Sequence, residues 1–209
     1  MRALIFFVLS IFASISFAQQ QEAINAHDAL KKLNKIMASP ELTQKAYEAG
    51  EERITLCGYC HGKDGNSTRL HIPNLAEQTP VYLFNTFEKF ANGEREDFVM
   101  SKAATMLDLD DRINIALYYG MQKVKHKEEV DPSLHDHAKA KFKQVCSACH
   151  GMTGEGHDEM PRIAGQPAEY VRLTLEAFRA GGEHRPGSMM IPFAQQLTDA
   201  DIKALASYI

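Results

Sequence analysis

The chain has little sulfur, no excess of basic charge and only one long apolar run, and each shortage removes a class of protein. The formal net charge is −4 over 209 residues, whereas nucleic-acid-binding proteins show a basic excess. The one strongly apolar run lies at 1–18. It is shorter than the roughly 20 residues of a membrane span and ends in small residues, as signal peptides do. We therefore expect no nucleic-acid partner, a signal peptide at 1–18 and a protein exported to the periplasm; an uncleaved N-terminal anchor is the alternative interpretation of this run.

All four cysteines lie in two copies of one pentapeptide, CGYCH (57–61) and CSACH (146–150). With a one-residue gap after the aligned motifs, residues 73–93 align with residues 161–181, where 8 of 21 positions are identical. The identical pairs are Pro73/Pro161, Ala76/Ala164, Gln78/Gln166, Tyr82/Tyr170, Thr86/Thr174, Glu88/Glu176, Phe90/Phe178 and Gly93/Gly181. The chain is therefore an internal duplication of two halves.

Both halves have the periodicity of helices. Residues 79–93 and 167–181 carry apolar side chains at helical spacing and end in glycine, a C-terminal signal. Residues 107–120 and 197–209 contain Asp or Thr caps ahead of an apolar stripe. Alternation typical of strands is absent, so we expect an all-α fold. The expected division is a signal peptide at 1–18, an N-terminal arm or helix at 19–44, domains at 45–122 and 135–209, and a charged linker at 123–134.

Paired cysteines occur in several kinds of site, and the sequence around the pairs and between them distinguishes these kinds. A zinc ribbon needs two pairs roughly 15–20 residues apart, but these pairs are 89 positions apart. A thioredoxin-like dithiol needs a βαβ core, and two vicinal disulfides suit an oxidising compartment. Neither explains why His61 and His150 directly follow the second cysteine of each pair.

C-x-x-C-H is the attachment signature of c-type haem. Two cysteines on one helical turn can each form a thioether to the porphyrin edge, and the following histidine then presents its imidazole to the iron. We expect two covalently bound haem c groups. The expected attachment residues are Cys57, Cys60, Cys146 and Cys149, with His61 and His150 as axial ligands.

The repeat also selects the second axial ligand of each iron. Met100 and Met190 each lie seven residues before a leucine, in the matched stretches 100–119 and 190–209. A methionine thioether raises the reduction potential and closes the site, as an electron carrier requires. Nearby methionines, Met106, Met160 and Met189, have no matched partner. The histidines that would serve bis-histidine coordination also lack a matched partner, so we expect them at the surface: His71, His126, His135, His137, His157 and His184.

Other repeated or clustered side chains have simpler interpretations. The pairs Tyr82/Tyr170 and Phe90/Phe178 are expected to pack the core. Lys139, Lys141 and Lys143 alternate on a helix that faces water, and a docking patch is the alternative interpretation.

The chain resembles the dihaem cytochrome c4 family over about residues 45–209. The shared features are CxxCHG-x-x-G, P-x-L/I-A-x-Q-x-x-x-Y, F-x-x-G, the methionine seven before a leucine and the closing helix, and each occurs twice in order. The resemblance implies two tandem class I cytochrome c domains about a pseudo-twofold axis, with haem propionates near their interface. One departure is Glu77, because Gly165 and the family carry glycine there.

The resemblance implies a periplasmic dihaem electron carrier of a respiratory chain, with no catalytic residue. Its expected partner is a terminal oxidase or another respiratory complex, through which any membrane association would run. One alternative is a dihaem enzyme, either a peroxidase or a sulfur-compound oxidoreductase, but a methionine in each half argues against the open iron it needs. Another is a cytochrome subunit of a larger complex, attached through 19–44. The charge is also uneven, with 8 basic and 12 acidic residues in 45–122 against 8 and 9 in 135–209, so we expect the two haems to differ in potential or in partner.

Overall fold

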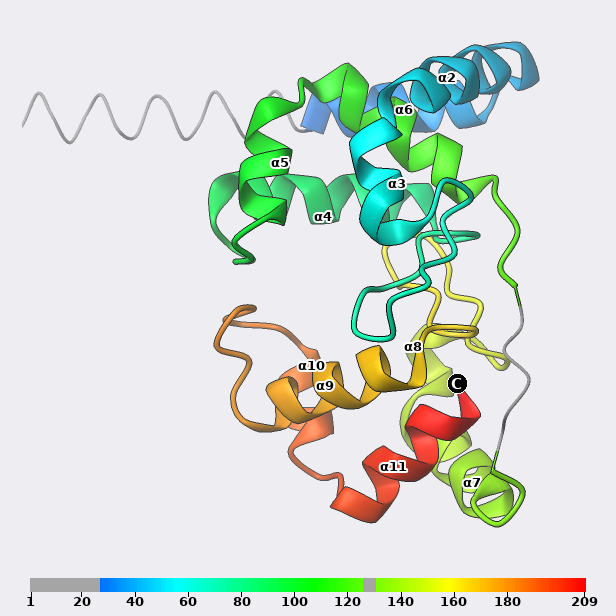
Figure 1. Ribbon diagram of the computed structural model, residues 1–209, viewed down its shortest axis with the longest axis vertical. Coiled ribbons are helices and arrows are strands. Elements are labelled where there is room, and N and C mark those ends of the chain that lie inside the picture. The colour runs from blue at the N-terminus through cyan, green and yellow to red at the C-terminus, as the bar shows by residue number, and fades with distance from the viewer. Residues whose placement is uncertain (1–26, 126–130) are drawn as a thin grey trace, which may run out of the picture.

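The computed structural model describes residues 27–125 and 131–209, so the expected signal peptide and His126 lie outside the described residues. Within these ranges the helices form two halves, one stacked on the other in Figure 1. The prediction of an all-α fold built from two duplicated halves is confirmed. None of the helices in the described ranges has the length and apolarity needed to cross a membrane.

The first half contains a helix at 27–37 and five further helices. These are α2 (Pro40–Arg53), α3 (Thr55–His61), α4 (Pro80–Asn92), α5 (Met100–Met106) and α6 (Leu109–Gly120). The starts of α2 and α4 follow from sequence, because a proline at the first turn is preceded by Ser39 or Thr79, whose hydroxyl accepts a backbone N–H. The helix at 27–37 buries Ala29 and Leu33 in the core of this half.

The second half repeats this order from α7 to α11. Its helices are α7 (His135–Val145), α8 (Ser147–His150), α9 (Ala168–Arg179), α10 (Met190–Ala194) and α11 (Asp199–Tyr208). In each half the first and last of these repeated helices pack together, α2 on α6 and α7 on α11. Figure 1 shows α3 and α8 near the level where the halves meet.

The second half has a small hydrophobic core of its own. Its buried cluster consists of Phe142, Leu197, Ile202 and Leu205, with a few half-buried neighbours that include Cys146. A domain of this size is short of buried apolar area. A large apolar cofactor next to such a cluster would supply the missing core.

Candidate functional site

The first cysteine motif lies on a helix that turns its reactive side chains to one side. On α3, Cys57, Cys60 and His61 stand at positions i, i+3 and i+4, which neighbour one another on a helix surface. The glycine that follows, Gly62, ends the helix with a φ of 80°. The thioether and imidazole positions needed for c-type haem are therefore on one face.

The second motif has the same placement with a break in the helix. Cys146 caps the end of α7, and α8 then carries the remainder of the motif to His150. Gly151 ends α8 with a φ of 86°, as Gly62 does in the first half. The duplication thus extends from the pentapeptide to the turn that follows it.

In each motif the first cysteine is held as a neutral thiol, the form less suited to binding a metal. All four are free thiols. Burial raises the pKa of the Cys146 thiol to about 11 and also raises that of Cys57, whereas a thiolate is what binds metal. In the described ranges, no three His, Cys, Asp or Glu side chains gather as a metal site.

Both motif histidines are buried and held in one orientation. His61 is 8% exposed and His150 6%. The Nδ1 atom of His61 lies 2.9 Å from the carbonyl oxygen of Pro73, and that of His150 lies 2.9 Å from the carbonyl oxygen of Pro161. Because a carbonyl only accepts, Nδ1 carries the proton and Nε2 keeps its lone pair for iron.

Burial also fixes the protonation of these rings. It lowers the pKa of both His61 and His150, and the hydrogen bond to each proline carbonyl offsets only part of that shift. Both imidazoles are therefore neutral near pH 7, which is the form that binds a metal.

The two matched methionines occupy the same place in their halves. Met100 is the first residue of α5 and Met190 the first residue of α10, and both are half-buried. Met106 and Met189, which lack a matched partner, are 80% and 63% exposed. Met100 and Cys57 pack against the same hydrophobic cluster. Among the described residues of the second half, Met190 is not part of the cluster that contains Cys146.

Two arginines belong to the site although the repeat did not point to them. Arg95 lies 4.5 Å from the centre of the Phe90 ring, and Arg185 lies 5.2 Å from the centre of the Phe178 ring. Phe90 and Phe178 are themselves buried, as predicted. Among the described residues neither guanidinium has a carboxylate within ion-pair distance, so together they form a cationic site suited to an acidic ligand.

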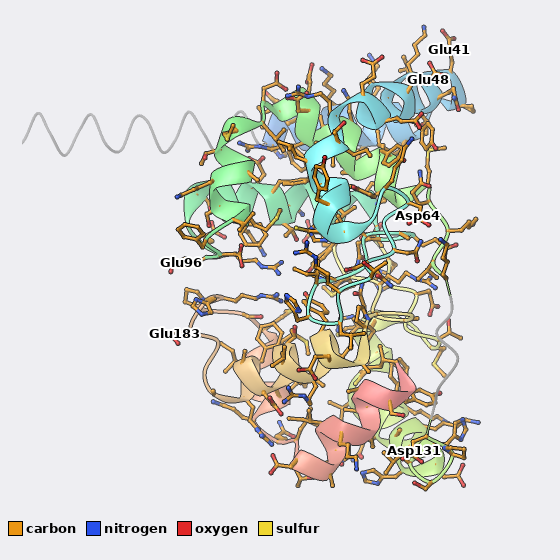
Figure 2. The ribbon with its side chains drawn as sticks, in the orientation of Figure 1. Glu41, Glu48, Asp64, Glu96, Asp131 and Glu183 are labelled. Atoms are coloured by element: carbon orange, nitrogen blue, oxygen red, sulfur yellow. The ribbon has the colours of Figure 1, made fainter. Side chains whose placement is uncertain are left out.

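The arginines act across the interface between the halves. Burial alone would raise the pKa of Tyr170, but the charges of Arg185 and Arg95 and a hydrogen bond from Arg185 lower it to about 8. The adjoining loops are joined by the backbone N–H of Glu96, which donates to the carbonyl of His184 at 2.9 Å. Figure 2 shows Glu96 and Glu183 on these two facing loops. Haem propionates are the carboxylates that such a site fits.

The remaining candidates lie outside the sites. His71, His137, His157 and His184 are exposed, and His135 is half-buried with its ring edge-on to that of Tyr208. Of the three lysines on α7, Lys139 and Lys143 are exposed, whereas Lys141 is bound to Asp201. The described histidines thus lack the burial that His61 and His150 share.

Two helical halves, each with a C-x-x-C-H turn, a buried neutral histidine and a matched methionine, define a dihaem c-type cytochrome. The cytochrome c family model matches residues 136–209. Cytochrome c4 of Pseudomonas aeruginosa is 34% identical over 173 residues, which cover 77% of this chain and 86% of that protein. The chain therefore belongs to the cytochrome c4 family, binds two haem c groups covalently and acts as an electron carrier.

A solved structure and a second relative agree with this assignment. The crystal structure of reduced recombinant cytochrome c4 from Pseudomonas stutzeri superposes with a TM-score of 0.71 at 33% identity, covering 78% of this chain and 96% of that one. A protein of Thiomonas intermedia named thiosulfate dehydrogenase electron acceptor is 28% identical, covering 78% of this chain and 82% of the relative. Tandem cytochrome c domains are thus confirmed as the fold.

Proposed function

We propose that this cytochrome carries electrons in the periplasm, with His61/Met100 and His150/Met190 as the axial ligands and the four motif cysteines as the thioether attachments. The observation that supports it most strongly is the pair of buried histidines, each with Nδ1 fixed on a proline carbonyl at 2.9 Å and Nε2 left for the iron. The proposed division of the chain is a signal peptide at 1–18, an arm or helix at 19–44 and domains at 45–122 and 135–209, joined by 123–134.

When bound, the two haems supply a reversible one-electron change of iron between ferric and ferrous. The residues of the chain keep that change free of other chemistry. His61 and His150 are neutral and fixed in orientation, so they donate to iron without a proton change. Met100 and Met190 would fill the positions that a peroxidase or a sulfur-compound oxidoreductase must leave open, which supports a carrier without a catalytic residue.

Arg95 and Arg185 would hold the propionates at the interface. Each is stacked on a buried phenylalanine, which fixes the guanidinium in place, and neither is neutralised by a carboxylate of the described chain. The bidentate geometry of arginine suits a carboxylate. This arrangement supports haem propionates lying where the two halves meet.

The proposed partners are redox proteins, with a terminal oxidase or another respiratory complex as acceptor. The Thiomonas relative suggests a thiosulfate-oxidising enzyme as one candidate donor. Two measurements would test the proposed donor and acceptor. The first is reduction of the purified cytochrome by such an enzyme with thiosulfate, and the second is reoxidation of the cytochrome by an oxidase.

The spectrum of the mature ferric protein tests the ligands. We expect two haems per chain, both low-spin, both showing the methionine-to-iron charge-transfer band, and no rapid binding of cyanide or peroxide. We expect that the His61→Gly and His150→Gly variants each change the spectrum of one haem only. The His157→Gly variant serves as the control, because His157 is exposed. A colourless mature protein, a high-spin haem that binds peroxide quickly, or an unchanged spectrum in His61→Gly would contradict the assignment.

A further inference from the structure

One glutamine from each half reaches across the interface and clamps the backbone of the other half. The side-chain amide of Gln166 accepts from the N–H of Asn74 at 2.9 Å and donates to the carbonyl of Asn74 at 2.8 Å. The side-chain amide of Gln78 makes the same two bonds to Arg162, at 2.7 Å and 2.8 Å. Gln78 and Gln166 are buried and are an identical pair of the repeat, so the contact is reciprocal.

The clamped residues directly follow the prolines that hold the histidines. The N–H of Asn74 and the carbonyl of Pro73 belong to a single peptide group, and that carbonyl binds Nδ1 of His61. A continuous chain of hydrogen bonds therefore runs from Gln166 of the second half, through one peptide, to His61 of the first half. The mirror chain runs from Gln78 through the peptide of Pro161 and Arg162 to His150.

We propose that Gln166 and Gln78 are positioning residues that tune the haem of the opposite half through the peptide bound to its histidine. The inference rests on the ligand assignment proposed above. An acceptor on the peptide N–H polarises the peptide, which makes its carbonyl a better acceptor for the imidazole N–H. A stronger bond at Nδ1 makes the histidine a more basic ligand, which favours the ferric iron.

The direction of the effect follows from these bonds. Removing the glutamine acceptor weakens the bond at Nδ1, lowers the basicity of the histidine and raises the reduction potential of the haem that this histidine binds. Hydrogen bonds in such chains strengthen one another by roughly 10–30%. We therefore expect a modest shift that appears only in the half that does not contain the substituted glutamine.

Potentiometry of the complete dihaem protein tests this crossed pattern. In Gln166→Met, a substitution of similar length, the ferrous-to-ferric ratio of the haem on Cys57 and Cys60 should rise about twofold to threefold at a fixed potential. At 59 mV per tenfold for one electron this is about 18 to 28 mV. The haem of the second half should keep its midpoint. Gln78→Met should give the mirror result, so each variant is the control for the other.

Each midpoint is assigned by repeating the measurement in Met100→His, in which only the first haem should move to a much lower potential. Thr79→Val provides a further control, because the Thr79 hydroxyl donates across the interface to the carbonyl of Asp158 at 2.8 Å without touching either histidine-bound peptide. A shift in the glutamine's own half, equal shifts in both haems, no shift, or a Thr79→Val shift of the same pattern would overturn the proposal. An unchanged spectrum in His61→Gly would instead refute the ligand assignment.

Discussion

Replacing Asp201 with Asn should destabilise the second half by an amount that depends on pH. Asp201 lies in the first turn of α11 and is 4% exposed. With Thr198 it forms a capping box, in which its carboxylate accepts from the Thr198 N–H at 3.0 Å. The carboxylate also lies 3.2 Å from Nζ of Lys141 and 2.9 Å from Nε2 of His137. The Asp201 side chain thus caps the start of α11 and also links this helix to α7.

The pKa of Asp201 gives the magnitude of this loss of stability. Burial alone would raise the pKa of Asp201, but the hydrogen bonds from Thr198 and the charge of Lys141 lower it from 3.8 to about 2. A folded-state pKa below the unfolded value means that the carboxylate stabilises the fold above about pH 4 and loses this effect as the pH falls through 2. At 1.36 kcal/mol per unit, the contribution is about 2 kcal/mol at pH 7, and roughly half of this remains at pH 3.

The assay is urea unfolding of the ferric dihaem protein, followed by circular dichroism between pH 3 and 7 and analysed as one transition for each half. Asp201→Asn should lower the unfolding free energy of the second half by about 2 kcal/mol at pH 7 and by about half of that at pH 3. Asp199→Asn is the matched control, because that side chain is 92% exposed in the same helical turn and, within the described part of the chain, pairs only with Arg179. Equal losses in the two variants, or an Asp201→Asn loss that stays constant with pH, would refute the reasoning.

Three further predictions concern the haem sites and their loops. Met100→Ala and Met190→Ala should each remove about half of the methionine-to-iron charge-transfer absorbance and lower one midpoint potential, because the thioether raises it; a variant that keeps the full band is evidence against that ligand. Gly65→Ala should cost about 2 kcal/mol or more of unfolding free energy, since φ is 73° and a Cβ would lie 2.6 Å from the backbone nitrogen of the facing loop. Gly93→Ala, with φ 82° and open space around it, should cost only about 1 kcal/mol, and equal losses would rule out the steric argument. Potentiometry should resolve two midpoints, the lower one in the more acidic half (45–122), and a single midpoint would contradict the link between charge and potential.

Much of this architecture could be predicted because the duplication presents each element twice. The helical fold, the two attachment turns and the half-buried Met100 and Met190 all came from matched positions. Arg95 and Arg185 were missed because the loops between the helix-ending glycine and the arginine differ by two residues, so an ungapped alignment pairs Arg95 with Glu183. Their shared signal is the stacking on Phe90 and Phe178, which only coordinates show.

Contacts between the halves could not be predicted from the sequence, for a different reason. Gln78 and Gln166 are visible as an identical pair, but their partners lie 84 and 92 positions away in the chain. No local pattern encodes such a pairing. The helix at 27–37 was equally hard to assign, because it buries only a narrow stripe that contains Ala29 and Leu33.

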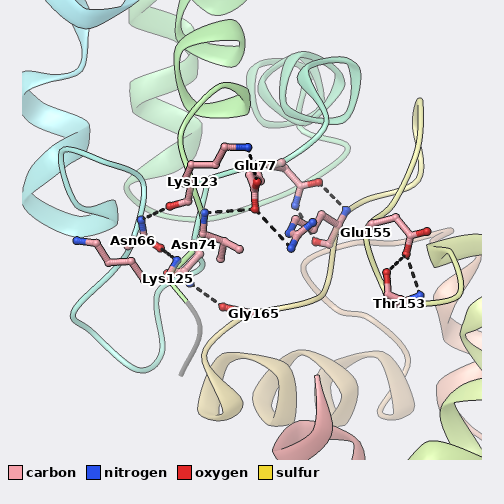
Figure 3. A network of polar contacts seen from close by, with 11 residues as sticks. Asn66, Asn74, Glu77, Lys123, Lys125, Thr153, Glu155 and Gly165 are labelled. Atoms are coloured by element: carbon pink, nitrogen blue, oxygen red, sulfur yellow. Dashed lines mark hydrogen bonds and ion pairs between the residues drawn. The ribbon is translucent and has the colours of Figure 1, made fainter. Parts of the chain in front are cut away.

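The departure at Glu77 is explained by its position across the interface. Glu77 adopts a left-handed φ of 54°, as Gly165 does at 77°, and for a residue with a Cβ this costs roughly 1–2 kcal/mol. The residue facing Gly165 is Asn74, whose side chain donates to the Gly165 carbonyl at 2.7 Å (Figure 3). The residue facing Glu77 is Arg162, the counterpart of Asn74, whose guanidinium lies 3.5 Å from the Glu77 carboxylate.

The two departures therefore compensate each other as a pair. Partial burial would raise the pKa of Glu77, but the bonds from Lys123 and the Val124 N–H and the charge of Arg162 lower it, so the carboxylate is ionised at neutral pH. The Glu77 carboxylate accepts hydrogen bonds from Lys123 at 2.9 Å and from the Val124 N–H at 3.3 Å, and bonds to a charged group contribute about 1.5–3 kcal/mol, which offsets the backbone strain. On one side of the interface the Asn74 side chain binds the Gly165 carbonyl, and on the other Arg162 forms an ion pair with Glu77. The ion pair puts one positive and one negative charge beside the peptide that binds His150. The duplicated halves thus keep the same hydrogen-bond geometry around their histidines while differing in local electrostatics, which is how two copies of one domain can hold haems of unequal potential.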